Sequence, residues 1–316
     1  MFNKARLYIL IVLLAAWASP ALAQPAKPAA PAQAAPAQAA PSQQALVNQP
    51  NAEAQAAPSP QELFDQLNKD AQAGNPVAMV NLGLIHANAD LNKRNYGISL
   101  DWYKKAAAKN LPEGHYYVGT CYEIGQGTKT DLKAAFQSYE KAANLGLSPA
   151  SFKLSRMYAI GQGVAADQGK ALEYLKKSAE ANYPPAINEL GAVNILGQLG
   201  IKSDPKTAFD LFTKATKFGN SEAMLNLAVV YRDGRGRPVN NVQALKWFLL
   251  ARAFNNQNPA LETTIANVRD KLKPAEVTTA EKEATAWRDN FVKEAQAAQQ
   301  QAQAAPAPAP AAPPKK

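Results

Sequence analysis

The chain of 316 residues has very few of the side chains that build metal, redox or nucleophilic sites. It contains one cysteine, Cys121, so no intramolecular disulfide can form. Its two histidines, His86 and His115, show no recognised zinc-ligand spacing with this cysteine. We therefore predict no catalytic residue, no metal site and no cofactor, and we expect packing alone to stabilise the fold.

A dense run of basic residues is also missing. The formal net charge is +9, but lysines and arginines are spread thinly along the chain. Nucleic-acid surfaces usually cluster basic residues among aromatic ones. The composition thus argues against nucleic-acid binding. We interpret the charge as a solvated surface, with weak attraction to an anionic envelope as the alternative.

The sequence has a single long apolar run, at its start. Lys4 and Arg6 precede it, it extends from Leu7 to Trp17, and Ala21-Leu22-Ala23 forms the small-x-small pattern that signal peptidases cleave. The run is shorter than the roughly 20 apolar residues that span a bilayer. We predict a signal peptide over residues 1–23 and export to the periplasm, with secretion as the alternative and membrane contact at most peripheral. An uncleaved membrane anchor is the other interpretation.

Large apolar side chains are nearly absent from two blocks rich in alanine, proline and glutamine, residues 24–60 and 295–316. Such segments cannot bury enough surface to offset the conformational entropy that ordering removes. We predict a disordered linker over the first block and a disordered tail over the second. The folded part should therefore lie between them.

An internal repeat organises this folded part. Similar segments begin 36, 36, 36 and 37 residues apart, at Ala78, Gly114, Ala150, Ala186 and Ala223. A second anchor keeps the same step, at Lys105-Ala106, Lys141-Ala142, Lys177-Ser178, Lys214-Ala215 and Leu250-Ala251. Two anchors that share one period over five units indicate a repeat architecture.

Each unit is predicted to form two helices. Apolar residues at unit positions one, five and eight, such as Ala150, Leu154 and Met157, share one face of the first helix. Position six is always small, which predicts a close helix approach, at Gly83, Gly119, Ser155, Gly191 and Ala228. The second helix carries a large apolar residue, for which Trp102 and Tyr139 are the candidates, followed by an alanine pair.

A glycine-rich turn separates the two helices in most units, as in Gly125-Gln126-Gly127 and Gly161-Gln162-Gly163. Glycine supplies the positive φ that a helix C-terminus often needs. Asp131, Asp167 and Asp204 follow at matching places and are predicted to cap the second helix. These turns are not phosphate-binding loops, because no strand precedes them and no Lys-Ser/Thr pair follows.

The repeated residues resemble the Sel-one-like repeat family, which is related to the tetratricopeptide repeats. The best match is Ala150 to Asn182, and it includes Tyr158, Gly161, Gly163, Val164, Asp167, Lys170, Ala171 and Lys177. The resemblance implies an all-α, right-handed solenoid of about five helix-turn-helix repeats over residues 61–258, used mostly as a scaffold for protein partners. Some cysteine-rich secreted members are linked with β-lactam binding or hydrolysis, but their paired cysteines are absent here.

Several segments depart from the repeat. The first unit has an unusual loop from Ala89 to Gly97, and a lone helix is predicted from Gln61 to Gly74. Two capping helices are expected over residues 259–294. Thr278 is the predicted start of the second, and Ala284, Trp287 and Phe291 form its apolar stripe. We interpret this helix as a lid over the last repeat, with a separate partner site as the alternative.

The candidate binding residues are those at outward positions three, four and seven of the first helices, which usually line the concave face of such a solenoid. They are Tyr116, Tyr117, Thr120, Phe152, Lys153, Arg156, Asn188 and Glu189. Aromatic residues and arginine are enriched at binding hot spots. The alternative is that some of them, Phe152 especially, only fill the gap between repeats. Cys121 and His86 occupy positions that are apolar or aromatic in other units, which predicts core packing.

Together these features predict an exported scaffold, adaptor or regulator of a bacterial cell envelope that binds a protein or peptide on its concave helical face. No reaction is predicted. Two other functions stay open, namely a ligand-binding protein or hydrolase for cell-wall or β-lactam material, and a structural tether to wall or membrane.

Overall fold

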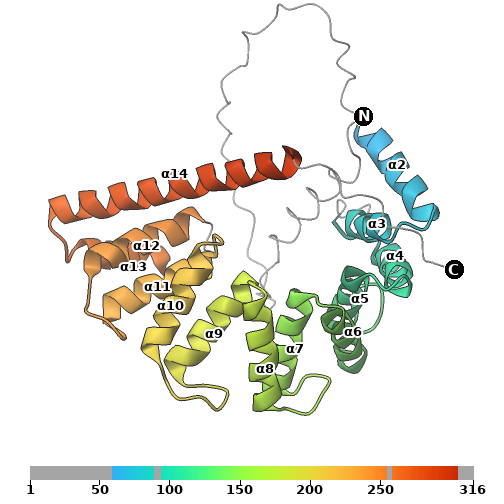
Figure 1. Cartoon of the computed structure of the whole chain (residues 1–316), viewed down its shortest axis with the longest axis horizontal. Helices are drawn as coiled ribbons and strands as arrows, with labels where there is room; N and C mark the ends of the chain where they lie inside the picture. Colours follow the sequence, from blue (N-terminus) through green and yellow to red (C-terminus); the bar gives the residue numbers. More distant parts are fainter. Residues whose placement is uncertain (1–58, 89–93, 255–257, 305–316) are drawn as a thin grey trace, which may run out of the picture.

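The computed structural model describes residues 59–88, 94–254 and 258–304, and these residues form helices and connecting turns without a strand. In the described part of the chain, helix α2 (Pro60–Gln72) precedes the repeats (Figure 1). The repeats are five helix pairs: α3 (Pro76–Asn88) with α4 (Tyr96–Ala108), α5 (Pro112–Ile124) with α6 (Leu132–Asn144), α7 (Ser148–Ile160) with α8 (Gln168–Glu180), α9 (Pro184–Leu196) with α10 (Pro205–Thr216), and α11 (Ser221–Asp233) with α12 (Asn241–Ala253). The predicted all-α solenoid is confirmed.

Some predictions concern segments outside the described residues. They are the signal peptide over 1–23, the linker up to residue 58, residues 89–93 of the unusual first loop, and the tail from residue 305. The lone helix predicted before the repeats is confirmed as α2, whose Ser59 and Glu62 form a reciprocal capping box.

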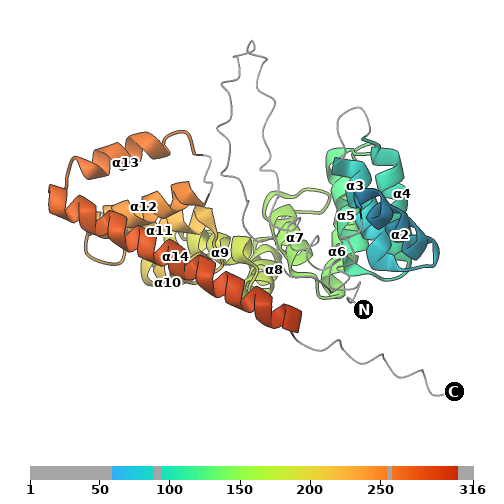
Figure 2. The ribbon, with the colours of Figure 1, turned by 90° about the horizontal axis from the view of Figure 1, so that it is seen from above.

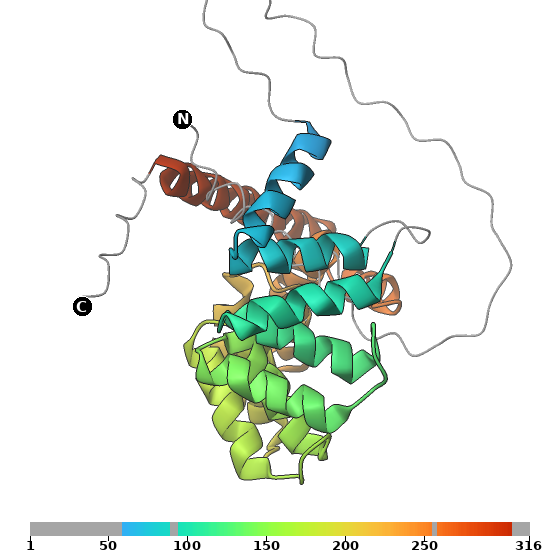
Figure 3. The same cartoon turned by 90° about the vertical axis from the view of Figure 1, so that its right-hand side faces the viewer.

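The helix pairs stack into an arc that opens toward α2 and α14 (Pro274–Ala304) (Figure 1). From α2 to α13 each helix packs against the next one in the chain, and two pairs of successive first helices also contact each other directly, α3 with α5 and α9 with α11. No two second helices make a comparable contact among the described residues. The first helices therefore line its inner face, and Figure 3 shows the N-terminal helices side-on, stacked in successive layers.

Side-chain caps begin the second helices as predicted. Asp131, Asp167 and Asp204 each accept a hydrogen bond from a backbone N–H of the following turn, at distances of 2.9 to 3.1 Å. Asn95 and Asn240 do the same in the first and fifth repeats. The aspartate pattern does not include these two residues, although an asparagine side chain supplies the same kind of acceptor oxygen.

The small residue at position six allows the two helices of a repeat to touch. A methyl group added to Gly119 would lie 2.9 Å from ring atoms of Tyr139, and one added to Gly191 would lie 2.6 Å from Phe212. Both rings are buried at the centre of their repeats. The predicted close approach is thus confirmed for these units, and it explains glycine in the middle of a helix.

The large residue of the second helix was assigned wrongly in the first repeat. Tyr103, not Trp102, is the buried residue, at 3% exposed. It lies 36 residues before Tyr139 and therefore occupies the equivalent place. Trp102 is only partly buried, and Lys105 lies over its ring with the ammonium 4.0 Å from the centroid.

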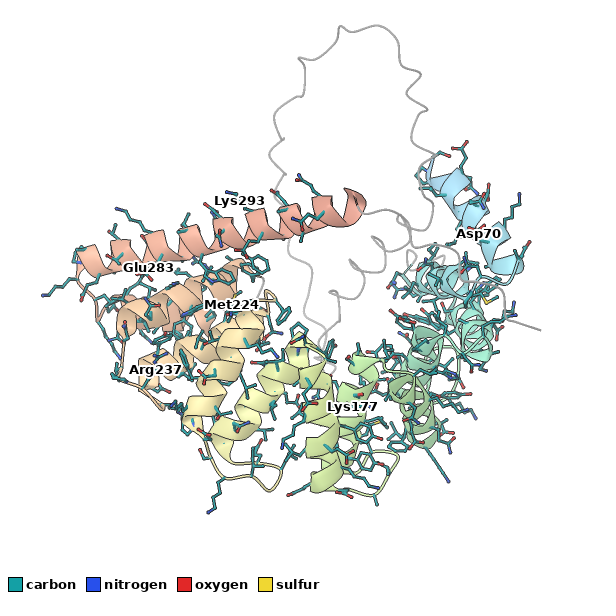
Figure 4. The ribbon with its side chains drawn as sticks, viewed as in Figure 1. Asp70, Lys177, Met224, Arg237, Glu283 and Lys293 are labelled. Carbon is teal, nitrogen blue, oxygen red and sulfur yellow. The ribbon has the colours of Figure 1, made fainter. Side chains whose placement is uncertain are left out.

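Two helices follow the last repeat, α13 (Leu261–Arg269) and α14. Ala280 and Ala284 of α14 are buried in the core of the fifth repeat, and the Trp287 ring packs 5.5 Å from that of Trp247. Glu283 accepts hydrogen bonds from Gln243 and Lys246 of α12, and these bonds hold the polar edge of the contact between α14 and α12 (Figure 4). The helix covers the last repeat, as the lid interpretation requires.

Both predicted ends of α14 are wrong. It begins at Pro274 rather than Thr278, because proline suits the first helical position and the Thr278 hydroxyl donates back to the Pro274 carbonyl. It ends at Ala304 and not at residue 294. Alanine and glutamine are good helix formers, and extending a helix that is already nucleated is easier than starting one. Figure 2 shows α14 extending from the last repeat as far as the level of α8.

Candidate partner-binding face

The eight predicted residues lie on three consecutive first helices, α5, α7 and α9, and so on the inner face of the arc. Arg156 is exposed, and the other seven are partly buried. The structure therefore brings the eight predicted residues together on one face. The contacts of each side chain show whether it packs within the protein or can bind a partner.

The two tyrosines of α5 mainly pack. Tyr117 stacks on Tyr103 of the preceding helix at 4.9 Å, and Tyr116 lies 5.5 Å from Tyr139 of the following one. Burial raises the pKa of both the Tyr116 and Tyr117 phenols. These rings fill the space between helices and are only partly exposed.

A polar bridge joins α5 to α7. The Lys153 ammonium lies 2.8 Å from the carboxylate of Glu123, which also accepts a hydrogen bond from the Tyr139 hydroxyl. The Thr120 hydroxyl lies 3.2 Å from the same tyrosine oxygen. Lys153 thus links neighbouring repeats, whereas Thr120 supports Tyr139 within its own repeat. The sequence reasoning missed Glu123, since its partner lies 30 residues away at a different unit position.

Phe152 and Arg156 differ in their surroundings although they share a helix. The Phe152 ring lies 5.5 Å from the Tyr183 ring and packs against the core of the fourth repeat, as the gap-filling alternative requires. The Arg156 guanidinium lies 5.9 Å above the Phe152 ring and forms no ion pair within 4 Å among the described residues. Arg156 is therefore a cation available to a partner.

Glu189 of α9 is a partly buried carboxylate. It makes no hydrogen bond or ion pair with another described residue. Burial raises the pKa of this carboxyl, and the charge of Arg156 offsets part of that effect. Beside it, the side-chain amide Nδ2 of Asn226 in α11 donates to the side-chain oxygen Oδ1 of Asn188 at 2.9 Å. Asn226 was not predicted, although it occupies the same unit position as Lys153.

The few potential nucleophiles and bases lie apart. Cys121 is buried, as predicted, and burial raises the pKa of its thiol to about 11. Burial and Lys141 lower the pKa of His115. His86 is only partly buried, with its ring edge-on to Phe64 at 6.5 Å. Within the described ranges, no three histidine, cysteine or acidic side chains come close enough to share a metal ion.

Fold and face together define a helical repeat protein of the solenoid class. More narrowly, five consecutive stretches match the Sel1 repeat family, at residues 76–111, 112–147, 148–183, 184–219 and 221–253. They cover more than half of the chain, so the protein belongs to this family. Sel1-repeat proteins generally mediate protein–protein interactions and are typically not enzymes.

Two solved structures are similar over the repeats. One is a protective antigen of uropathogenic Escherichia coli strains with an SLR fold, 25% identical at a TM-score of 0.65; the alignment covers 81% of this chain and 54% of the antigen. The other is a Sel1 repeat protein from Oxalobacter formigenes, 26% identical at a TM-score of 0.59, with 66% and 60% covered. This chain thus spans less than two thirds of each. A search of curated proteins gave no match.

Among the described helices, none has both the length and the apolar character that crossing a bilayer requires.

Proposed function

We propose that this protein is exported to the periplasm and acts there as a scaffold, adaptor or regulator of the bacterial cell envelope, binding a protein or peptide on the inner face of its solenoid. The N-terminal sequence supports export, with its basic start, apolar run and Ala21-Leu22-Ala23 site. Family membership supports a protein partner.

One observation carries the choice of the inner face. Arg156 and Glu189 lie on adjacent first helices, and neither has an ion pair among the described residues, whereas the nearby Lys153 and Glu123 satisfy each other. Aromatic edges and the Asn188–Asn226 amide pair surround them. Such a mixture of charge, amide and aromatic groups suits the backbone and side chains of a peptide.

Chemical crosslinking and affinity purification of the full chain from envelope extracts test the proposal. A double charge reversal, Arg156→Glu with Glu189→Lys, should reduce recovery of the crosslinked protein at least tenfold. The matched control is Lys177→Glu with Glu180→Lys, which reverses two exposed charges on α8 and should leave recovery unchanged.

Retention on peptidoglycan without any crosslinked protein would overturn the proposal in favour of a wall-binding protein. Cell fractionation tests export separately. A full-length chain in the cytoplasm would contradict it, and recovery from the medium would indicate secretion.

A further inference from the structure

Three consecutive first helices end in an exposed aliphatic residue. Ile124 is the last residue of α5, Ile160 of α7 and Leu196 of α9, and they are 44%, 66% and 57% exposed. They recur every 36 residues, so they form one line along the solenoid, here named the aliphatic row. Each lies four residues after position seven, on the side of its helix that faces the inner surface.

The same local backbone holds each member of the row. A glycine in the left-handed conformation follows, and its N–H donates to the carbonyl of Cys121, Met157 or Val193. A glutamine comes next in every case, and none of these glutamine side chains makes a hydrogen bond with a described residue (Gln126, Gln162 and Gln198). The three repeats therefore present an aliphatic group and an open amide in the same orientation.

Packing within the repeat does not account for the row. The equivalent residue is Asn88 in the first repeat and Asp233 in the fifth, so the fold accepts polar side chains at this place. Exposed aliphatic surface is unfavourable by about 25 cal/mol per Å². An exposed line of aliphatic residues that is flanked by polar residues, here Asn88 and Asp233, is typical of an interaction surface.

The spacing of the row selects the kind of partner. Successive first helices touch directly at α3–α5 and at α9–α11, and helices in contact lie about 8–10 Å apart. Because the repeat step is the same, α5, α7 and α9 should follow one another at a spacing of about 10 Å. An α-helix advances about 10.5 Å in seven residues and returns to nearly the same face. A strand covers about 10 Å in three residues, but a side chain three positions further along points to the opposite face from the first one. Polyproline helices match the distance, but they dock on aromatic-lined grooves, whereas this row is aliphatic.

Charge selects the partner further. Arg156 lies four residues before Ile160 on the same face of α7, is exposed, and has no ion pair among the described residues. The whole chain carries a formal charge of +9. An acidic partner is therefore attracted both overall and at the middle of the row.

We propose that the aliphatic row binds an acidic amphipathic helix of a partner protein, with apolar residues seven positions apart and a carboxylate beside the central one. The glutamine amides would hydrogen-bond to polar groups along the edge of that helix. This inference rests on the proposed function, because it specifies the partner of the same inner face.

The test measures fluorescence anisotropy of labelled synthetic peptides with the full chain. The probe is a 21-residue helix with leucine at every seventh position and glutamate beside the central leucine. A second peptide has the same composition with the leucines on different faces, and a third is polyproline. We expect the first to bind at least tenfold more tightly than the other two. Equal binding by the scrambled peptide, or preferred binding of polyproline, would overturn the inference.

Variants locate the binding. Ile124→Ser, Ile160→Ser and Leu196→Ser together should weaken the first peptide at least tenfold. The matched control removes three exposed aliphatic residues elsewhere, Ile98, Leu145 and Val239, also as serine, and should bind normally. Arg156→Glu should weaken this peptide and favour a version with lysine at the central glutamate. Equal loss in both triple variants would refute the row as the site.

The two proposals can fail separately. If the row variant still recovers the crosslinked envelope protein while the Arg156/Glu189 reversal does not, the row inference is wrong and the proposed function stands. If no protein is recovered by either variant or by the unchanged chain, the proposed function fails.

Discussion

The contact between Gly119 and Tyr139 makes a quantitative prediction about the repeat interior. Glycine to alanine inside a helix normally stabilises it by about 0.8–1.0 kcal/mol. Here the new methyl would lie 2.9 Å from two atoms of a fully buried ring. The ring cannot withdraw freely, because its hydroxyl is bonded to Glu123. Overpacking typically costs about 1–3 kcal/mol, so Gly119→Ala should destabilise the protein by about 1 kcal/mol.

A second substitution should reverse the sign of this effect. Tyr139→Leu alone should destabilise by about 2–4 kcal/mol, because it leaves a cavity and removes a hydrogen bond to a charged group. In that background the space beside Gly119 is open, so Gly119→Ala should stabilise by up to about 1 kcal/mol. The coupling free energy between the two sites is then about 2 kcal/mol.

Urea unfolding followed by circular dichroism measures these changes, and amide hydrogen exchange in α5 and α6 localises them, because repeat arrays can unfold in steps. Gly169→Ala is the matched control. Gly169 lies in the first turn of α8, where an added methyl meets only a carboxylate oxygen of Asp167 at 3.3 Å. That change should stabilise by about 0.4–1 kcal/mol. If Gly119→Ala stabilises equally, or if the two substitutions add, the close-approach argument is refuted.

Three further predictions concern single side chains. Asp167→Ala should destabilise by about 1 kcal/mol in urea unfolding, whereas Asp167→Asn keeps the cap and should change little. Burial raises the pKa of Glu189, so the stability of the wild-type protein should fall as the pH rises from 4.5 through that raised pKa. Glu189→Gln should remove this loss. If the melting temperature of the variant depends on pH as that of the wild type does, the prediction is contradicted. Trp287→Ala should destabilise by about 2 kcal/mol, less than for a fully buried tryptophan, with faster hydrogen exchange confined to α12 and α14; faster exchange in α3 to α6 would show that α14 is not a local lid.

The fold could be predicted because its determinants repeat. The step of 36 residues located ten helices, and small residues at position six predicted where helices touch. The errors fell where the pattern stops. Trp102 was chosen by its size, although the period points to Tyr103. The ends of α14 depend on Pro274 and on alanine-rich helix extension, for which no second copy in the chain gives a comparison.

The sequence predicted which unit positions form the candidate face, but it did not predict which side chains at those positions are free to bind a partner. Unit positions three, four and seven do lie on the inner side, but the partner of each side chain comes from another repeat. Glu123 binds Lys153 across 30 residues, and Asn226 binds Asn188 across 38. Such pairs decide which side chains remain available, and no local pattern in the sequence reveals them.

A residue type can recur in a repeat protein for one of two reasons, and the structure tells them apart by burial. Residues that recur and are buried, such as Leu154 and Gly119, recur because every repeat needs the same packing. Residues that recur while exposed have no such reason, and Ile124, Ile160 and Leu196 are of this kind. Since the end repeats carry asparagine and aspartate at the same place, the fold does not require the three aliphatic residues. Binding rather than folding therefore explains the three aliphatic side chains, and a partner that contacts three repeats at once would need all of them.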